Sequence, residues 1–322
     1  MSIAALVADG LLREGAAVDV ADLRDEVAAR RISVRIAGGW SFDVLPDRGL
    51  DIGAAWWRGV PVAWRSPVEV DPGPGRTWGE RFLGGLLVTC GPDHIGVAPD
   101  GSLHGAHSST RAHGVTWRRT RDVAGGVGVE IAGTIDDVRM FGRHVRIERT
   151  IAAGTGDGRL TVRDRVTNLG LEPAPVVLLY HVNLGAPAVV PGARVWIDAE
   201  TTTVREQTRG VPDASVLPAP LDRTEETVFA HEGVRGDGEG IARALVTAPD
   251  GRNTEVAWTA ASLPRCYQWV LPTRGGWALG IEPSNAPLFG PSHDDERTRA
   301  VHVAPGAHVE TAVAIVHREA PA

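Results

Sequence analysis

Three ionisable side chains in this sequence stand where they could exchange protons with a bound molecule. His181 lies in the segment LLYHVNL and Glu282 lies in GIEPSN, and both follow apolar runs typical of strands. His104 lies in the short glycine-containing segment LHGAH. Imidazole titrates near neutral pH, and a carboxylate at the end of an apolar strand is costly unless it is paired or functional. These residue types suit acid–base chemistry. Each is a weak signal alone, because a single strand-end histidine is more often a core residue.

Two further segments combine unusual residue types with tight turns. In LPDRGLDI, Arg48 lies on a turn between Asp47 and Asp51, which predicts either a surface turn with local ion pairs or an arginine that faces a ligand. The segment FLGGLLVTCG is apolar, uncharged and glycine-bearing. It indicates a buried strand that another backbone or a ligand approaches closely, and plain core is the simpler interpretation for most of its residues.

Alternation of apolar and polar residues with a period of two dominates the chain and predicts half-buried strands. Residues 144–166 are predicted to form a hairpin, because two alternating segments flank a glycine-rich turn. The other predicted strands are residues 31–36, 176–180, 242–248, 255–259, 277–281 and 310–316.

The rest of the chain offers little helical signal. Only Val20–Arg30 is predicted as a helix, with Asp22 as its cap. Residues 205–240 are polar and irregular, which predicts a long surface excursion from a sheet. No repeat of fixed period and no linker-like change of composition occurs. We therefore predict an all-β fold of stacked antiparallel sheets, in which residues 1–322 form one domain and residues 1–30 are a candidate peripheral extension.

The composition excludes several classes of function. The net charge is −7 without a concentrated basic face, so nucleic acid is not a predicted partner. No window approaches the ~20 apolar residues of a spanning helix, and the first residues lack the basic region of a signal peptide. Cys90 and Cys266 are too few for a disulfide framework and are predicted to be free buried thiols. These features predict a cytoplasmic protein that binds no membrane.

Six short segments occur together in an order and spacing typical of one superfamily. They are PDRGLDIG, FLGGLLVTCG, LHG, VTNLG, LLYHVNLGAP and GIEPSNAP. From about Phe42 to Val316 the chain resembles the aldose 1-epimerase (galactose mutarotase-like) superfamily, and in particular its bacterial branch known as a domain of unknown function related to aldose epimerases.

The resemblance implies a supersandwich of antiparallel sheets with a sugar cleft on its concave face. It also implies an activity, the interconversion of the α and β anomers of a free sugar. Glu282 would take the proton of the anomeric hydroxyl, and His181 would give a proton to the ring oxygen. His104 would bind the sugar near the ring oxygen and assist.

The sequence departs from the better-known galactose mutarotases at two binding residues. The arginine that those enzymes carry has no counterpart within FLGGLLVTCG, so Arg48 or Arg81 is the candidate replacement. Their sugar-binding aspartate has no evident counterpart, and Gln268 and Trp269 lie where one is expected. The full set of predicted sugar-binding residues is Arg48, Arg81, His107, Asn183, Gln268, Trp269 and Asn285.

The implied chemistry needs no cofactor. Mutarotation requires one base and one acid on opposite sides of a hemiacetal, and positioned groups contribute ~10²–10⁴-fold each. The sequence contains neither GxxxxGK[ST] nor GxGxxG after a strand, and no metal or organic cofactor is predicted. Ten tryptophans against two tyrosines favour stacking on a sugar. Trp56, Trp57 and Trp269 are the candidates, although a single tryptophan is more often core.

Two other classes of protein remain open. His104 and His107 are three residues apart and could join His181 and Glu282 in the mononuclear site of a metal-dependent isomerase or lyase, provided that residues 103–107 turn. A non-catalytic sugar-binding protein on the same fold is the other alternative. The predicted partner is a small-molecule sugar, and a homodimer is a candidate assembly.

Overall fold

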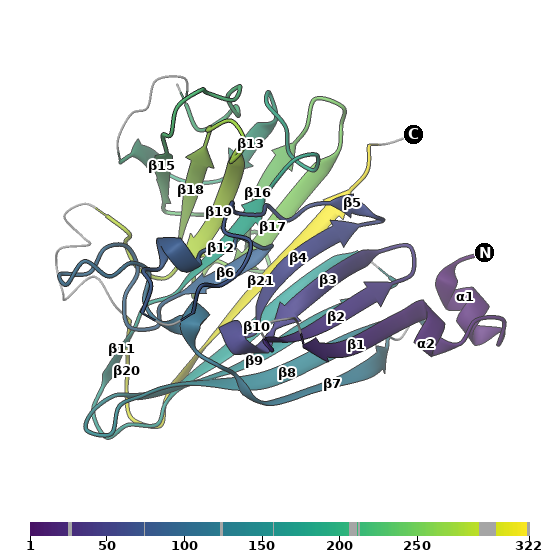
Figure 1. The fold of residues 1–322 in the computed structure, drawn as a ribbon, viewed down its shortest axis with the longest axis horizontal. Coiled ribbons are helices and arrows are strands. Elements are labelled where there is room, and N and C mark those ends of the chain that lie inside the picture. Colours follow the sequence, from purple (N-terminus) through teal and green to yellow (C-terminus); the bar gives the residue numbers. More distant parts are fainter. Residues whose placement is uncertain are drawn as a thin grey trace.

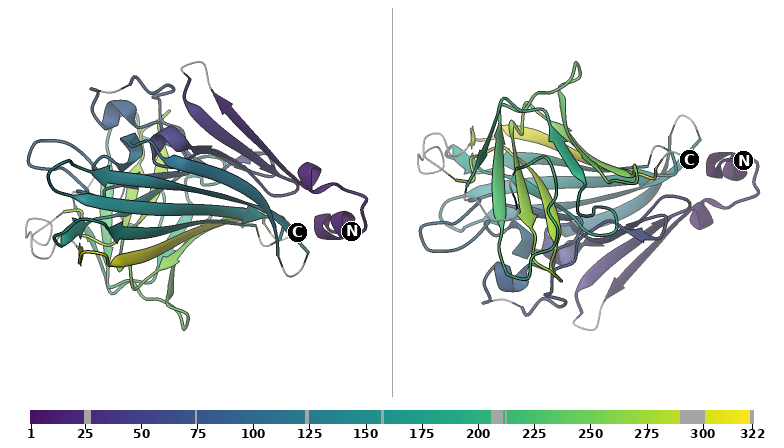
Figure 2. Two further views of the ribbon diagram at one scale, coloured as in Figure 1. Left: turned by 90° about the horizontal axis from the view of Figure 1, so that it is seen from below. Right: turned by 90° about the horizontal axis from the view of Figure 1, so that it is seen from above.

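Two antiparallel β-sheets pack face to face in the computed structural model (Figures 1 and 2). It describes residues 1–24, 28–73, 75–122, 125–156, 158–205, 211, 213–289 and 301–320. In spatial order the first sheet consists of β1 (Val18–Arg24), β2 (Arg30–Ile36), β3 (Trp40–Leu45), β4 (Asp51–Trp57), β6 (Leu87–Cys90), β12 (Leu179–Leu184), β19 (Ala278–Ser284), β18 (Arg265–Leu271), β15 (Thr227–Glu232) and β14 (Thr201–Val204), with β5 (Val60–Pro61) beside β4.

The second sheet consists, again in spatial order, of β13 (Arg194–Ile197), β16 (Ile241–Thr247), β17 (Asn253–Thr259), β21 (His308–Arg318), β10 (Arg159–Asn168), β9 (His144–Gly154), β8 (Val127–Val138) and β7 (His113–Arg121). A separate pair is formed by β11 (Ala174–Val176) and β20 (Val301–Val303). Apolar side chains from both large sheets meet in one hydrophobic cluster, which is the core of the sandwich.

Helices are few and short. They are α1 (Ile3–Ala8), α2 (Glu14–Ala17) and the 3₁₀ turns at Pro46–Arg48, Gly79–Arg81 and His107–Ser109. Figure 2 shows α1 and α2 protruding at one end of the sandwich, next to β1. None of the helices in the described residues is long and apolar enough to cross a lipid bilayer.

The structure confirms the all-β class and most of the predicted strands. Residues 144–166 form the hairpin of β9 and β10, which pair from Leu160 opposite Ala153 to Asn168 opposite Val145. The strands predicted at 31–36, 242–248, 255–259, 277–281 and 310–316 correspond to β2, β16, β17, β19 and β21. The predicted strand at 176–180 is two strands, since β11 ends at Val176 and β12 begins at Leu179. That the whole chain forms one domain stays a prediction.

Two local predictions were wrong. The segment predicted as the helix Val20–Arg30 contributes β1, which pairs with β2 along its full length, while residues 25–27 lie outside the described residues. The backbone hydrogen bonds between β1 and β2 outweighed the weak helical pattern of residues 20–24. The excursion predicted at residues 205–240 is wrong at β15, whose residues Thr227 to His231 are buried between β14 and β18, while residues 206–210 and 212 lie outside the described residues.

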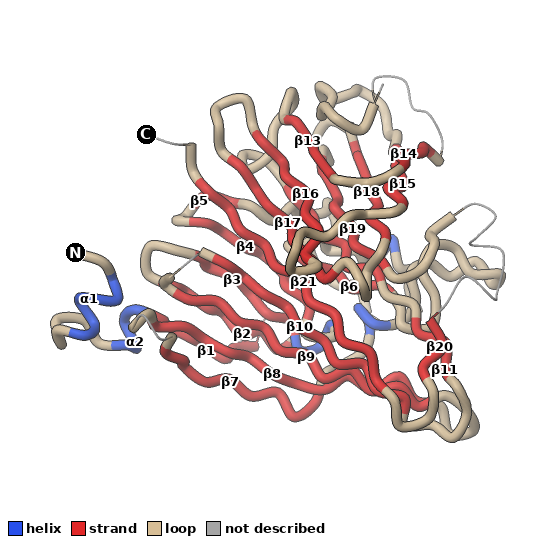
Figure 3. Tube along the Cα trace, turned by 180° about the vertical axis from the view of Figure 1, so that it is seen from behind, coloured by secondary structure: helices blue, strands red, loops and turns tan. Residues whose placement is uncertain are grey.

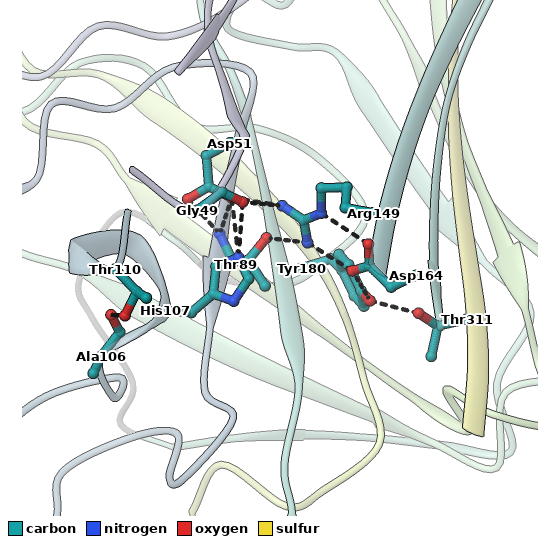
Figure 4. A network of polar contacts seen from close by, with 10 residues as sticks. All are labelled: Gly49, Asp51, Thr89, Ala106, His107, Thr110, Arg149, Asp164, Tyr180 and Thr311. Atoms are coloured by element: carbon teal, nitrogen blue, oxygen red, sulfur yellow. Dashed lines mark hydrogen bonds and ion pairs between the residues drawn. The ribbon is translucent and has the colours of Figure 1, made fainter. Parts of the chain in front are cut away.

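A buried polar network joins the two sheets around Arg149 (Figure 4). The Arg149 side chain on β9 has no exposed surface. Its Nη1 donates to Asp51 Oδ1 on β4 at 3.0 Å, and its Nη2 donates to Asp164 Oδ2 on β10 at 2.6 Å. Thr89 Oγ1 on β6 accepts a further bond from Nη2, and Tyr180 Oη on β12 donates to Asp164 Oδ2. The network therefore connects five strands across the core.

The charges of this network depend on one another. Although burial alone would raise it, the charge and hydrogen bonds of Arg149 lower the pKa of Asp164. Burial raises the pKa of Asp51 to about 6, and the charge of Arg149 opposes that rise. Removing water from an ion costs several kcal/mol, and a buried ion is tolerated only when partners satisfy it.

We predict that Arg149→Met lowers the free energy of unfolding by about 3–5 kcal/mol, because Asp164 would be left buried without its counter-charge. Chemical denaturation measures this loss. Arg146→Met is the matched control on the same strand, since its ion pair with Asp136 lies at the surface and should contribute less than ~1 kcal/mol. Equal losses in the two variants would contradict the prediction.

Candidate functional site

A cavity of about 540 Å³ lies on the face of the first sheet that points away from the core. Side chains alternate along a strand, and Tyr180 on β12 points into the core network, so the adjacent His181 points into the cavity. On β19, Ile281 belongs to the core cluster and Glu282 lines the cavity. The other lining residues come from β15 and β18, from the ends of the connection between β14 and β15, from the segments 78–82 and 96–104 on either side of β6, and from residues 288–289 after β19.

The three predicted catalytic residues and Trp269 line this same cavity. His181 Nε2 lies 3.2 Å from Glu282 Oε1, because the two residues occupy facing positions between the paired residues of β12 and β19. The rings of His104 and His181 are 6.4 Å apart, and those of His181 and Trp269 are 5.4 Å apart. Segments separated by long stretches of sequence therefore converge on one volume.

Burial holds the acid–base pair in its uncharged form. Desolvation, assisted by the charge of Glu226 and opposed by that of Arg205, raises the pKa of Glu282 to about 8. Burial, with a smaller contribution from His104, lowers the pKa of His181 to about 3. At neutral pH these shifts favour a protonated Glu282 carboxyl group beside a neutral His181 ring. Within the described residues, neither Glu282 Oε1 nor His181 Nδ1 has a hydrogen-bond partner.

His104 is held by its backbone and by one ring nitrogen. Its φ angle of 60° lies in the left-handed region, and its Nδ1 accepts a hydrogen bond from the backbone N–H of Gly96 at 3.3 Å. Burial lowers the pKa of His104 to about 3, so its ring is neutral near pH 7. A neutral ring that accepts at Nδ1 carries its proton on Nε2, and His104 is therefore a hydrogen-bond donor at that atom.

Gly280 makes the close approach of His181 and Glu282 sterically possible. A Cβ atom at residue 280 would lie 2.6 Å from Glu282 Oε1, 3.0 Å from His181 Cε1 and 3.1 Å from Trp269 Cβ. The backbone of Gly280 is not in the left-handed region, so its conformation would accept any residue. The glycine is needed for space and not for backbone freedom.

Aromatic rings form much of the remaining wall. Trp78 and Phe82 stack with their centroids 4.3 Å apart, and Phe82 lies 5.5 Å from the ring of His181. Trp78 also packs at 4.7 Å from the ring of His104. Flat apolar faces beside hydrogen-bonding groups suit a ligand with both C–H and O–H groups, such as a sugar ring.

Two charged residues of the cavity, Arg205 and Glu226, were not predicted from the sequence. They form an ion pair with each other, and Glu226 Oε2 accepts a hydrogen bond from Trp269 Nε1 at 3.0 Å. Both lie within residues 205–240, the stretch predicted as a surface excursion. The signal that could have found them is the apolar segment TVFAHE directly after Glu226, which forms β15.

Arg48 and Arg81 do not reach the cavity, because both bind Asp71. Arg48 Nη1 lies 2.5 Å from Asp71 Oδ2, and Arg81 Nη2 lies 2.9 Å from the same oxygen. Arg48 lines a separate cavity of about 310 Å³, and Arg81 lines another of about 740 Å³. Arg48 and Arg81 therefore lie close to each other, and neither lines the cavity that contains His181 and Glu282.

Four other predicted sugar-binding residues lie outside this cavity, and each has one or more polar groups bonded to backbone. His107 is fully buried beside the Arg149 network, where its Nε2 lies 3.1 Å from the carbonyl oxygen of Gly49. The amides of the other three also bond to backbone groups: Asn183 donates to the carbonyls of Gly85 and His181, Gln268 donates to that of Ala214, and Asn285 bonds to Leu178 and Val176. These contacts stabilise the strands that carry the cavity.

The structure also separates the histidines of the metal alternative, since His104 lines the cavity and His107 lies in the core. Among the residues described, no group of three or more His, Cys, Asp or Glu side chains is placed to hold a metal ion. Cys90 and Cys266 are both buried and free, as predicted.

Solved structures define the class of fold. The chain is similar to a "putative aldose 1-epimerase" from Klebsiella pneumoniae, with a TM-score of 0.83 and 19% identity over 93% of this chain and 83% of that one. It is also similar to a galactose mutarotase-like protein from Clostridium acetobutylicum (TM-score 0.63, 14% identity, 93% and 98% covered). A galactose 1-epimerase from Lactobacillus acidophilus gives a TM-score of 0.61 at 13% identity, with 94% and 99% covered. The fold is therefore galactose mutarotase-like.

The family follows from the sequence match. The chain belongs to the family described as Domain of unknown function (DUF4432), which it matches over residues 26–316. No functionally curated protein gives a significant match. The resemblance inferred from the six segments is thus confirmed for family and fold.

We predict that Glu282→Gln becomes more stable relative to the wild type as pH rises. The folded-state pKa of about 8 exceeds the ordinary value of 4.5, so the stability due to this proton is fully present below pH 4.5 and is lost as pH rises through 8. Glutamine has no such loss. Denaturation of both proteins across this pH range measures the difference, with Glu232→Gln on β15 as the control. A constant difference would contradict the prediction.

Proposed function

We propose that this protein interconverts the α and β anomers of a free sugar by acid–base ring opening. The observation that carries the proposal is the close approach of His181 Nε2 and Glu282 Oε1, which lie 3.2 Å apart in a cavity walled by aromatic rings. The likeness of the fold to galactose mutarotase-like proteins supports the same conclusion.

The pair holds the one proton that the reaction needs. A sugar whose anomeric hydroxyl donates to Glu282 stabilises the carboxylate form, and the carboxyl proton then moves across the 3.2 Å contact to His181 Nε2. Glu282 accepts the proton of the hydroxyl O1 while His181 gives its proton to the ring oxygen. The bond between C1 and the ring oxygen breaks, and O1 becomes the oxygen of the open-chain carbonyl.

Ring closure reverses the proton transfers. After rotation about the C1–C2 bond, His181 takes back the proton of the former ring oxygen as that oxygen attacks the other face of C1. Glu282 returns its proton to O1, which completes the opposite anomer. His104, which donates from Nε2, would hold the ring oxygen in place during both steps.

The aromatic side chains and the charged pair of the cavity would contact the substrate. Trp78, Phe82 and Trp269 would stack against C–H faces of the sugar. Arg205 and Glu226 would hold its hydroxyls, because the pair offers N–H donors beside a carboxylate acceptor. A membrane-independent cytoplasmic role with a small-molecule sugar as partner belongs to the same proposal.

We predict that Glu282→Gln and His181→Asn each lower the rate of anomer exchange by ~10²–10⁴-fold, because each removes one of the two proton-transfer groups. One-dimensional proton NMR of a panel of aldoses, starting from a single anomer, measures the rate.

Glu232→Gln on β15 and His317→Asn on β21 are the controls, since neither residue lines the cavity. Exchange no faster than in buffer for the wild-type protein would refute the proposal. A wild-type protein that binds sugar without accelerating the exchange would identify a non-catalytic binding protein, and a Glu282→Gln variant that exchanges sugar at an accelerated wild-type rate would show that Glu282 is not the base.

We predict that Gly280→Ala lowers kcat by ~10-fold or more with a smaller change in KM. The added methyl would lie 2.6 Å from Glu282 Oε1 and force the carboxyl group away from His181. Anomer-exchange kinetics measure both constants. Gly39→Ala is the control, because its Cβ would meet no atom closer than 3.5 Å. Unchanged kinetics in Gly280→Ala would show that the spacing of the pair is unimportant.

A further inference from the structure

Five exposed apolar side chains gather on two turns at one end of the second sheet. Val138, Met140 and Phe141 lie in and beside the turn between β8 and β9, and Met140 and Phe141 are 89% and 90% exposed. Leu169 and Leu171 lie in the turn between β10 and β11, and Leu171 is 92% exposed. We call these five residues the end patch. Side chains of this size exposed so fully and in one place mark interaction surfaces.

The two turns are neighbours. Asn168 at the end of β10 faces Val145 at the start of β9, and the backbone N–H of Leu169 donates to the carbonyl of His144 at 2.8 Å. Val138 at the end of β8 faces His144 from the other side. Figure 3 shows the loops at this end of the sheet beside β11 and β20. The end patch is therefore continuous across both turns.

The turn that carries Met140 and Phe141 is held rigidly. Arg143 donates to the carbonyl oxygens of Pro92, at 2.8 Å, and of Pro175, and it also pairs with Asp137. These contacts fix the base of the turn against two other segments. The apolar side chains at its tip are thus presented to solvent by an anchored backbone, and an interface formed there would lose little conformational entropy.

Two charged side chains flank the end patch with opposite signs. Arg139 lies on the β8–β9 turn and Glu172 lies on the β10–β11 turn, and both are exposed. Within the described part of the chain neither side chain forms an ion pair or side-chain hydrogen bond. A cation on one turn and an anion on the other make the surface complementary to itself under a two-fold rotation.

We infer that the end patch is the interface of a homodimer. Two copies related by a two-fold axis bury Phe141 and Leu171 against each other's turns, and Arg139 meets the partner's Glu172 on both sides of the axis. A standard interface buries ~800 Å² per partner, and these five exposed side chains would form its apolar centre. The net charge of −7 disfavours an anionic membrane surface as the occupant.

Analytical ultracentrifugation over a wide concentration range tests the inference without using activity. The wild-type protein is expected at twice the 34.1 kDa mass of the chain. Phe141→Ser combined with Leu171→Ser should weaken dimerisation by ~100-fold or more, because these side chains occupy its centre. Leu11→Ser is the matched control, since Leu11 is 70% exposed on the N-terminal segment and should leave the mass unchanged. Circular dichroism checks that every variant is folded.

Charge-reversal variants distinguish binding of a second copy of this chain from binding of any other partner at the end patch. Arg139→Glu alone and Glu172→Arg alone should each weaken the dimer by ~10-fold, and the double variant should restore it, because the reversed charges again pair across the axis. A monomeric wild-type protein at all concentrations overturns the inference, as does a monomer that sediments with lipid vesicles through Phe141. A double variant weaker than both single ones overturns the proposed two-fold arrangement.

Discussion

The contact between the Arg149 guanidinium and the carboxylates of Asp51 and Asp164 is the constraint on which the rest of the sandwich depends. It ties β9 and β10 of one sheet to β4 of the other in the interior. Hydrophobic packing has no preferred direction, whereas hydrogen bonds to a planar guanidinium have a fixed geometry. The core cluster supplies most of the stabilising burial, and the Arg149 network fixes how one sheet lies over the other.

Burial has a different effect in the cavity, where it favours uncharged side chains over ion pairs. Around Arg149 every charge meets a partner, but Glu282 is buried beside a neutral imidazole, so that its proton is retained near pH 7. This arrangement destabilises the folded protein at alkaline pH and provides a proton donor and acceptor 3.2 Å apart. Gly280 is part of the same arrangement, since a Cβ atom there would clash with Glu282 Oε1 and separate the pair. Such local costs are typical of functional sites.

The sequence was informative where one residue's environment follows from its own strand. Period-two alternation predicted the β9–β10 hairpin and most other strands, and the family segments led to His104, His181 and Glu282, which line one cavity. The sequence was uninformative about side chains whose hydrogen-bond partners lie far away along the chain. Asn183 and Gln268 are polar residues on strands near the cavity, and only the fold shows that their amides bond to backbone. Arg205 and Glu226 were missed although the apolar segment after Glu226 indicates a strand, because only the pairing of β14 with β15 shows that both residues lie beside the cavity.

The Arg149 network and the cavity lie on opposite faces of β12. Tyr180 donates to Asp164 in the core, and the next residue, His181, faces Glu282 in the cavity. Because side chains alternate strictly along a strand, a register shift of one residue would place the histidine in the Arg149 network and the tyrosine in the cavity. Tyr180 is paired with Thr89, which itself accepts from Arg149, so the network holds β12 and β6 in a single register. The buried arginine thereby determines which face of the sheet presents the imidazole, although it lies on the other side of the strand from the cavity.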